Sequence, residues 1–182
     1  GQVFWIHAVS VGEVQAALPL VRGLMSRFPH ARIVLSTTTP TGMERVRTAL
    51  GSEVIHRYAP YDLVGATGRF LDRVEPQLAV IVETEIWPNV IASCHERGVP
   101  VIFANTRLSE RSAAGYRRVR PLMRQVFDQV TAIGAQSEDD ARRLQSIGAP
   151  TDKVTVTGST KFDVAMSPSL NEAGQVVRRQ WG

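Results

Sequence analysis

The sequence predicts an α/β protein with a Rossmann-like, doubly wound and mostly parallel sheet. Short apolar runs rich in β-branched residues alternate with longer segments of helical period, which is the pattern of a parallel sheet covered by helices. The chain has 182 residues and is 43% hydrophobic, enough to bury the core of one ordinary domain. Its charged fraction of 21%, with no repeat or low-complexity tract, is typical of a folded chain rather than a disordered one.

The strands and helices are expected in alternation along the chain. The predicted strands cover residues 3–9, 32–36, 53–56, 78–82, 99–104, 131–135 and 154–156. Between the first two, apolar side chains from Val14 to Phe28 recur at helical spacing, and Pro19 is expected to kink that helix without ending it. Further helices are predicted over residues 41–50, 66–74, 88–97 and 137–147. Ser137 is suited to cap the last of these and Gly148 to end it.

The stretch from residue 109 to residue 129 differs because no strand accompanies it. It combines a buried apolar stripe with an outer face of arginines, and Pro121 is a natural helix start or kink. After residue 157, polar residues lead into a last helical piece that ends at Trp181 and Gly182. This end resembles an interdomain connection, so we expect a domain over residues 1–157 and a linker with an orphan helix over residues 158–182.

Charge and cysteine content limit the partners and the cellular compartment that we expect for this chain. The net charge of +4 favours anionic partners such as phosphates, nucleotides or acidic lipid surfaces. The single cysteine, Cys94, excludes an internal disulfide and any multi-cysteine zinc site, and fits a reducing compartment. No window reaches the roughly 20 apolar residues of a membrane span. We therefore expect a soluble chain, or one from which an anchor and a second domain have been removed.

Glu13 is the first candidate for chemistry. It follows the first strand at the start of a helix, and in open α/β sheets ligands bind at the carboxyl ends of the strands. Gly12 permits a sharp turn there, and the helix dipole is expected to keep Glu13 ionised, so that it could accept a proton from an attacking hydroxyl. Capping alone also explains such a carboxylate. His7 is expected to be structural, and the absence of a G-x-G-x-x-G run argues against a nicotinamide cofactor.

Three other strand ends carry polar residues. Thr38 and Thr39 follow the second strand and could cap a helix or bind sugar hydroxyls and phosphates. Glu83 and Glu85 follow the fourth strand, and Asn105 and Arg107 follow the fifth. The two glutamates could face the crevice, pair with Arg107, or simply precede a helix that starts at Pro88. Together these termini predict a polyhydroxylated or phosphorylated ligand.

Several runs, taken in order, closely resemble the Kdo transferases, which add 3-deoxy-D-manno-octulosonic acid (Kdo) from CMP-Kdo to the lipid A precursor of lipopolysaccharide. They are HAVSVGE (7–13), STTTPTG (36–42), PYD (60–62), VETEIWPN (82–89), NTRLSERSAAGY (105–116), AQSEDDARRL (135–144) and VTGSTKFD (156–163). They span nearly the whole chain. The sequence departs from the family pattern at Thr106 and Thr160, where alanine and leucine are common.

The resemblance implies the N-terminal, acceptor-binding half of a glycosyltransferase B-type (GT-B) enzyme. Glu13 would be the base of an inverting, metal-independent transfer that uses no cofactor, with CMP-Kdo bound mainly by a second domain. The residues expected to bind the acceptor are Ser10, Gly12, Thr38, Thr39, Glu83, Glu85, Asn105, Arg107, Arg117 and Arg118. With Arg111, Arg120 and Arg124, these arginines either meet phosphates or form a solvated helix face.

The implied partners are the lipid A precursor, an anionic membrane surface and the chain's own donor domain, with no nucleic acid. The implied location of the full-length protein is the cytoplasmic face of the inner membrane, and these residues alone are expected to be inactive. A non-catalytic lipid- or phosphate-binding module remains an alternative. A nucleotide-sugar epimerase half-domain is a second one, against which the runs at residues 7–13 and 82–89 argue.

Overall fold

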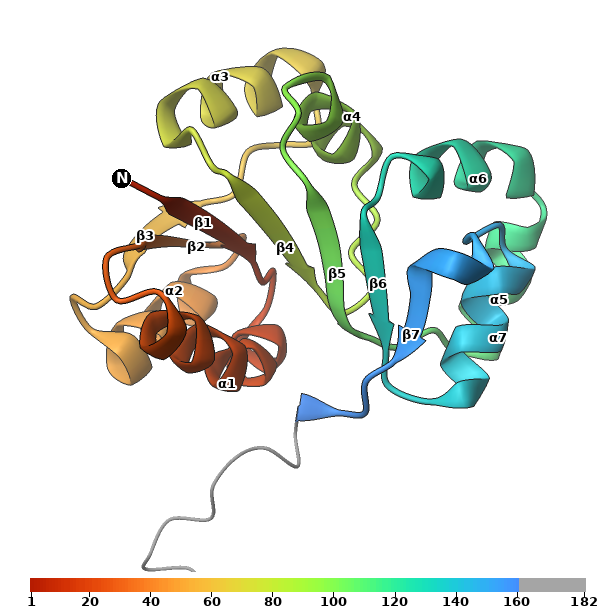
Figure 1. Ribbon diagram of the computed structural model, residues 1–182, viewed down its shortest axis with the longest axis horizontal. Coiled ribbons are helices and arrows are strands. Elements are labelled where there is room, and N and C mark those ends of the chain that lie inside the picture. The colour runs from red at the N-terminus through yellow and green to blue at the C-terminus, as the bar shows by residue number, and fades with distance from the viewer. Residues whose placement is uncertain (161–182) are drawn as a thin grey trace, which may run out of the picture.

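The computed structural model describes residues 1–160, and its centre is a parallel sheet of seven strands (Figure 1). The strand order is β3-β2-β1-β4-β5-β6-β7. The strands are β1 (Val3–His7), β2 (Arg32–Thr37), β3 (Ile55–Tyr58), β4 (Leu78–Val82), β5 (Val101–Thr106), β6 (Ala132–Ala135) and β7 (Val154–Val156). Every pairing is parallel. The predicted fold class is therefore confirmed, and the strand order reverses between β1 and β4.

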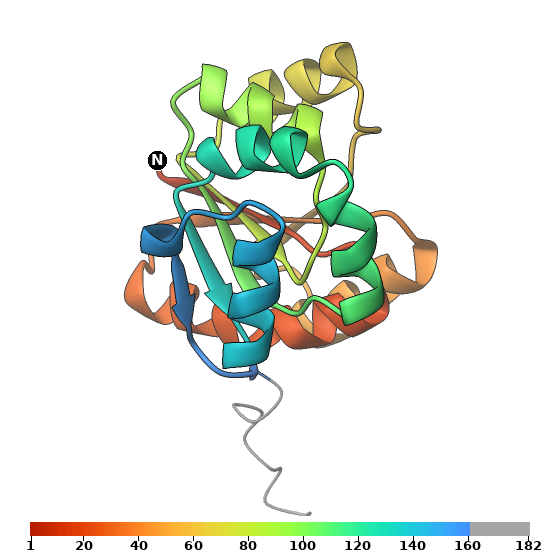
Figure 2. The ribbon, with the colours of Figure 1, turned by 90° about the vertical axis from the view of Figure 1, so that its right-hand side faces the viewer.

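Helices cover both faces of the sheet. They are α1 (Val11–Arg27), α2 (Pro40–Leu50), α3 (Val64–Val74), α4 (Pro88–Glu96), α5 (Glu110–Arg117), α6 (Arg120–Asp128) and α7 (Glu138–Ser146), with a short 3-10 turn at Thr151–Lys153. In Figure 1, α1 and α2 lie below the sheet and α3, α4 and α6 above it. Helices α5 and α7 lie together beside β6 and β7, which Figure 2 shows from their side.

Alternating side chains of the central strands supply two separate cores. On β1, Trp5 belongs to the core that packs under α4, α6 and α7, whereas Ile6 belongs to the core under α1 and α2. Both side chains are buried. Successive residues of a strand point to opposite faces, so a strand buried on both sides is apolar throughout its length. The continuous apolar runs in the sequence have this origin.

The element boundaries mostly agree with the sequence-based predictions, with two informative exceptions. Strand β5 begins at Val101 because Pro100 has no N–H to donate to the ladder, although its carbonyl accepts from the amide of Ala79. The stretch over residues 109–129 is two helices that meet at Arg118 and Val119, with Pro121 in the first turn of the second. Helix α1 continues through Pro19, as expected. The helical piece predicted near Trp181 lies outside the described residues.

Candidate functional site

The candidate site lies where the strand order reverses. The carboxyl ends of β1 and β4 are neighbours there, and ligands of open α/β sheets bind at such a point. Glu13 follows β1 in the first turn of α1, and Glu83 and Glu85 follow β4. The structure therefore brings together the carboxylates that the sequence placed at separate strand ends.

Glu13 is held by the turn that precedes it. Its Oε2 accepts a 2.8 Å hydrogen bond from the backbone N–H of Val9, and its Oε1 accepts one of 2.9 Å from the Ser10 hydroxyl. Ser10 caps α1 in return, because its Oγ accepts from the Glu13 amide at 3.3 Å. A Ser and a Glu three residues apart have the spacing of a capping box, which predicts the bond from the Glu13 amide to Ser10; the Glu13 side chain, however, accepts from the amide of Val9, one residue before the cap. The carboxylate is therefore fixed in orientation, and only 7% of the residue is exposed.

The environment raises the pKa of Glu13 above the ordinary value of a glutamate. Burial is the largest cause, and the charges of Glu85 and Glu83 act in the same direction. The hydrogen bonds from Val9 and Ser10 favour the ionised form and lower the pKa, but they do not cancel the effect of burial. The helix N-terminus, from which the sequence led us to expect an ionised Glu13, is therefore not the only influence on this carboxylate, because burial raises its pKa.

The β4 loop holds the second carboxylate in place. Glu85 Oε2 accepts a 2.8 Å hydrogen bond from Nε1 of Trp87, which immediately precedes α4. Glu83 has a φ of 61°, a left-handed conformation that is strained for a side chain of its size. Neither glutamate has a partner among the ion pairs of residues 1–160, so the suggested pairing with Arg107 is not present there. Both lie near enough to Glu13 to raise its pKa.

A buried aromatic side chain of β1 packs against the loop that follows β4, and the sequence did not indicate it as part of the site. The His7 ring packs edge-on against Trp87, with centroids 4.6 Å apart. Ser36 Oγ accepts from Trp5 Nε1 at 2.8 Å and lies 3.0 Å from His7 Nδ1. Burial lowers the pKa of His7 to about 4, so the imidazole is neutral at physiological pH. This buried, neutral side chain packs against the tryptophan that donates to Glu85.

The β2 loop contacts the Glu13 turn through its threonines. Both the amide and the hydroxyl of Thr38 donate to the carbonyl of Val9, at 3.2 and 3.1 Å. Thr39 caps α2 by accepting from the Gly42 amide, which was the simpler of its two predicted roles. An added Cβ at Gly12 would meet only the Ser10 hydroxyl, at 3.8 Å, so the turn itself leaves room for a side chain.

The β5 end is locked to the last described residues. Asn105 is buried with a φ of 56°, and its Oδ1 accepts from the Thr160 amide at 3.1 Å. Its Nδ2 has no hydrogen-bond partner within residues 1–160. The carbonyl of Arg107 accepts a hydrogen bond from the Thr84 hydroxyl, which ties this loop to the β4 loop. The Asn105 side chain therefore holds the backbone of Thr160 in the described structure, whereas Arg107 is exposed.

A largely apolar cavity of about 370 Å³ opens beside this end of the sheet. Its walls come from α1 and from one face of β4 to β7, and include Ala16, Leu20, Val82, Asn105 and Thr157. No helix of the described part of the chain covers the face of β5 to β7 on this side (Figure 1).

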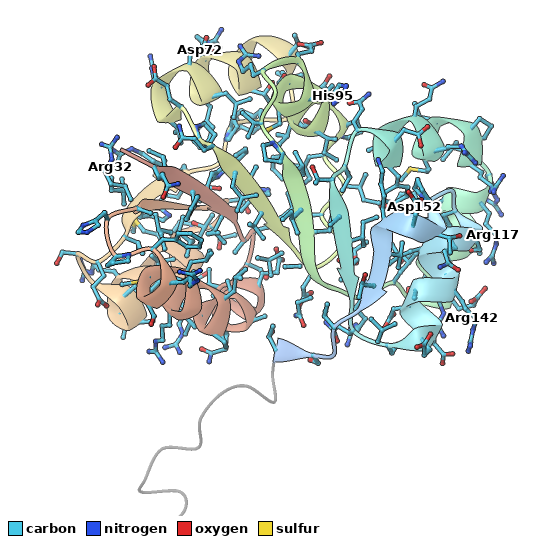
Figure 3. All side chains as sticks on the ribbon, viewed as in Figure 1. Arg32, Asp72, His95, Arg117, Arg142 and Asp152 are labelled. Atoms are coloured by element: carbon cyan, nitrogen blue, oxygen red, sulfur yellow. The ribbon has the colours of Figure 1, made fainter. Side chains whose placement is uncertain are left out.

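The structure does not bring the remaining predicted arginines to Glu13. Arg117 lies on α5 and pairs with Glu110 at 2.7 Å, and it stands on the opposite side of Figure 3 from β1. Arg118 is the exposed C-terminal cap of the same helix. In the sheet, β4 lies between β1 and the strand that precedes α5. These two residues form a separate surface.

Two features are absent from residues 1–160. Within residues 1–160 there is no group of three or more histidine, cysteine, aspartate or glutamate side chains placed to hold a metal ion. None of the helices in that part of the chain has the length and apolar character needed to cross a bilayer.

Comparison with known proteins decides the family. Residues 1–164 match the family model described as 3-deoxy-D-manno-octulosonic-acid transferase (kdotransferase). The chain belongs to the Kdo transferase family. It is 40% identical to the 3-deoxy-D-manno-octulosonic acid transferase of Haemophilus influenzae, covering 99% of this chain and 42% of that protein. It is 36% identical to the enzyme of the same name from Bordetella pertussis, covering 93% of this chain and 40% of that protein. The chain thus spans about two fifths of these Kdo transferases.

Solved structures show the same fold at low sequence identity. The UDP-GlcNAc 2-epimerase of Neisseria meningitidis aligns with a TM-score of 0.66 and 16% identity, covering 99% of this chain and 52% of that one. MurG of Acinetobacter baumannii aligns with a TM-score of 0.59 and 10% identity, covering 92% and 47%. At these identities the likeness concerns the fold alone, and the Kdo transferase domain corresponds to half of each of these GT-B proteins.

Proposed function

We propose that this chain is the acceptor side of an enzyme that transfers Kdo from CMP-Kdo to a lipid A precursor, with Glu13 as general base. Membership of the Kdo transferase family supports the reaction. The observation that carries the role of Glu13 is a buried carboxylate, fixed by Val9 and Ser10 at the strand-order reversal, with a raised pKa. A base is more effective as its pKa approaches the working pH.

The proposed step is concerted. A hydroxyl of the acceptor sugar attacks the anomeric carbon of Kdo while its proton passes to a carboxylate oxygen of Glu13. The bond between that carbon and the CMP phosphate oxygen breaks, its electron pair leaves with the phosphate, and attack from the opposite face inverts the configuration. Each Glu13 oxygen accepts one hydrogen bond within the described structure, so a second lone pair remains for the incoming proton. No metal ion or cofactor enters this proposal.

The acceptor is proposed to lie over the ends of β1, β2, β4 and β5. The residues that border this edge are Ser10, Gly12, Thr38, Thr39, Glu83, Glu85, Asn105 and Arg107. Thr38 and Arg107 are exposed there and offer a hydroxyl and a guanidinium. The donor nucleotide is proposed to bind mainly to a second domain that faces this edge. Because the relatives are more than twice as long as this chain, residues 1–182 alone are proposed to bind acceptor without turnover.

Arg117 and Arg118 are proposed to act away from the reacting centre. Arg118 is free of ion pairs among residues 1–160, whereas Arg117 already pairs with Glu110. We place the full-length protein at the cytoplasmic face of the inner membrane, where a lipid-linked acceptor is made available.

The test is Glu13→Gln in a protein that carries this chain together with a donor domain. Transfer of labelled Kdo from CMP-Kdo to a lipid A precursor should fall by about a hundredfold or more, as expected for loss of a general base. Glu44→Gln is the matched control, since Glu44 is an exposed glutamate of α2 that pairs with Arg47. Acceptor binding and circular dichroism should stay unchanged in both variants. Near-normal turnover of Glu13→Gln would remove Glu13 from the mechanism.

A further inference from the structure

The segment that joins β3 to α3 exposes an unusual number of large apolar side chains. Tyr61 is 83% exposed, Leu63 64% and Val64 69%, and they are close neighbours in the sequence. Tyr58, at the end of β3, is 51% exposed. This segment runs along the outside of the molecule at the edge that carries the Glu13 turn (Figure 2). Isolated exposed apolar residues are ordinary, but a contiguous group of them marks an interaction surface.

A basic groove adjoins these residues. It has a volume of about 480 Å³ and is formed by the end of β3, the joining segment and α3. Arg57, Arg69 and Arg73 line it together with Tyr58 and Tyr61, and its other walls are apolar, with no carboxylate. All three arginines are exposed, and none belongs to an ion pair within residues 1–160. The groove is therefore positively charged and lies beside exposed apolar side chains.

Two acidic residues close to the groove in sequence, Asp62 and Asp72, bind partners elsewhere. Both carboxylate oxygens of Asp62 face the start of α4, where they accept from the amides of Asn89 and Val90 at 3.4 and 2.9 Å. Asp72 binds Arg97 at 3.0 Å. The first turn of α3 contains no acidic residue that would offset its helix dipole. Each of these features leaves the positive charge of the groove uncompensated.

The same contacts hold the segment rigidly beside the candidate site. The amide of Ala59 donates to the carbonyl of Thr37 at the end of β2, and Asp62 anchors the segment to α4. Helix α4 follows directly on the loop that carries Glu85 and Trp87. A flat anionic surface that met this segment would therefore lie at the edge of the sheet where the acceptor is proposed to bind.

We propose that Arg57, Tyr61, Leu63, Val64, Arg69 and Arg73, here called the α3 entry surface, dock the protein on an anionic phospholipid bilayer. Tyr61, Leu63 and Val64 enter the boundary between headgroups and acyl chains, and the three arginines bind headgroup phosphates. A tyrosine suits this depth because its ring is apolar and its hydroxyl stays hydrated. The pairing of uncompensated arginines with apolar residues of this kind is the pattern of a surface that binds anionic membranes.

This inference rests on the proposed function only in expecting that the acceptor is membrane-borne. It differs from the sequence-based hypothesis, which assigned membrane or phosphate contact to the arginines of α5 and α6. That second surface also exposes apolar residues, Val119 and Leu122, but Arg117 is paired with Glu110, and Arg124 lies 3.9 Å from Asp128. The α3 entry surface has the more exposed apolar group, and all three of its arginines are without ion pairs within residues 1–160, whereas Arg117 and Arg124 of the second surface are paired.

The test is flotation of this chain with vesicles of equimolar phosphatidylglycerol and phosphatidylethanolamine, compared with vesicles of phosphatidylcholine alone. Wild type should bind the anionic vesicles and lose binding as salt is raised. Arg69→Gln with Arg73→Gln should raise the dissociation constant for the vesicles on the order of fivefold for each arginine removed. Tyr61→Ser with Leu63→Ser should weaken it at low salt and at high salt alike. The matched controls are Arg117→Gln with Arg118→Gln, and Leu122→Ser.

A second measurement locates the contact without relying on lost binding. A polarity-sensitive fluorophore attached to Leu63→Cys should shift to shorter wavelength with anionic vesicles, whereas the same label on Leu122→Cys should not. The native Cys94 is buried and its thiol pKa is raised to about 12, so it competes poorly for the label. Absence of vesicle binding by wild type, equal losses in both sets of variants, or a shift only at residue 122 would each overturn the proposal. Because no sugar transfer is measured, these results stand apart from the outcome for Glu13→Gln.

Discussion

Glu13 Oε2 and the backbone N–H of Val9 are 2.8 Å apart, so the carboxylate folds back onto the turn that delivers it. This bond and the one from Ser10 hold a charged group in a place where only 7% of its residue is exposed. The same carboxylate holds the turn that begins α1 and lies at the carboxyl edge of the sheet. A structural role and a chemical role are therefore compatible in one residue.

Removing the Ser10 hydroxyl should have two separable effects. Ser10→Ala removes the cap of α1, which should lower the free energy of unfolding by about 1 kcal/mol. It also removes a hydrogen bond that lowers the pKa of Glu13, so that pKa should rise further in carbon-detected NMR titration. Ser109→Ala is the control, because Ser109 caps α5 by accepting from Ser112. It should lose similar stability and leave the Glu13 titration unchanged.

The pKa of Glu13 should fall when a neighbouring negative charge is neutralised. Glu85 raises that pKa through its charge, and a glutamine in its place can still accept the hydrogen bond from Trp87. In a protein with its donor domain, Glu85→Gln should move the acidic limb of kcat/KM to lower pH. Glu96→Gln, at the far end of α4, should leave the limb in place. An unmoved limb in Glu85→Gln would mean that Glu13 does not set it.

A buried hydroxyl without a partner should reduce stability. Thr106 Oγ1 is buried and accepts or donates no hydrogen bond within residues 1–160, and Thr106 is one of the two departures from the family pattern. Thr106→Val keeps the shape and should raise the free energy of unfolding by about 1 kcal/mol in urea denaturation. Thr37→Val is the opposite case, since Thr37 Oγ1 lies 2.9 Å from His56 Nε2. It should lower stability, and a loss in both variants would contradict the explanation.

Stability should fall between about pH 6.5 and pH 4 because of His7. Burial lowers the pKa of His7 from 6.5 to about 4, so in this range the unfolded chain binds a proton that the folded chain does not. The stabilising contribution is complete above pH 6.5 and is lost as the pH falls toward 4, by up to about 3 kcal/mol. Comparison of unfolding midpoints in His7→Phe, which should show a shallower decline, isolates this contribution. His30→Gln, which changes an exposed histidine, should behave as wild type.

The sequence alone indicated the fold with little ambiguity. Parallel strands buried on both faces are apolar throughout, and the helices between them carry caps such as Ser137, so each element can be recognised from its neighbours in the chain. The family runs likewise lie in continuous segments. The break of the arginine-bearing stretch into α5 and α6 was less clear, because Pro121 fits both a kink and a new start.

Tertiary structure decided which predicted residues act together. Thr38, Glu83 and Glu85 meet the Glu13 turn because β2 and β4 flank β1 in the sheet, an order that no local pattern encodes. Arg117 and Arg118 are excluded from that group for the same reason. The α3 entry surface also depends on the folded structure, because only the fold exposes its apolar side chains and directs Asp62 and Asp72 to other partners.

By itself, then, the sequence determined the family, the α/β fold and Glu13 as the residue to examine, since these depend on short-range pattern and continuous motifs. The pKa of that glutamate was decided only by the folded chain. Burial and the charges of Glu83 and Glu85, 70 or more positions away in the sequence, raise it through space, whereas the helix N-terminus and its hydrogen bonds act locally. Desolvation and charge proximity are properties of the packed structure, and for that reason they could not be read along the chain.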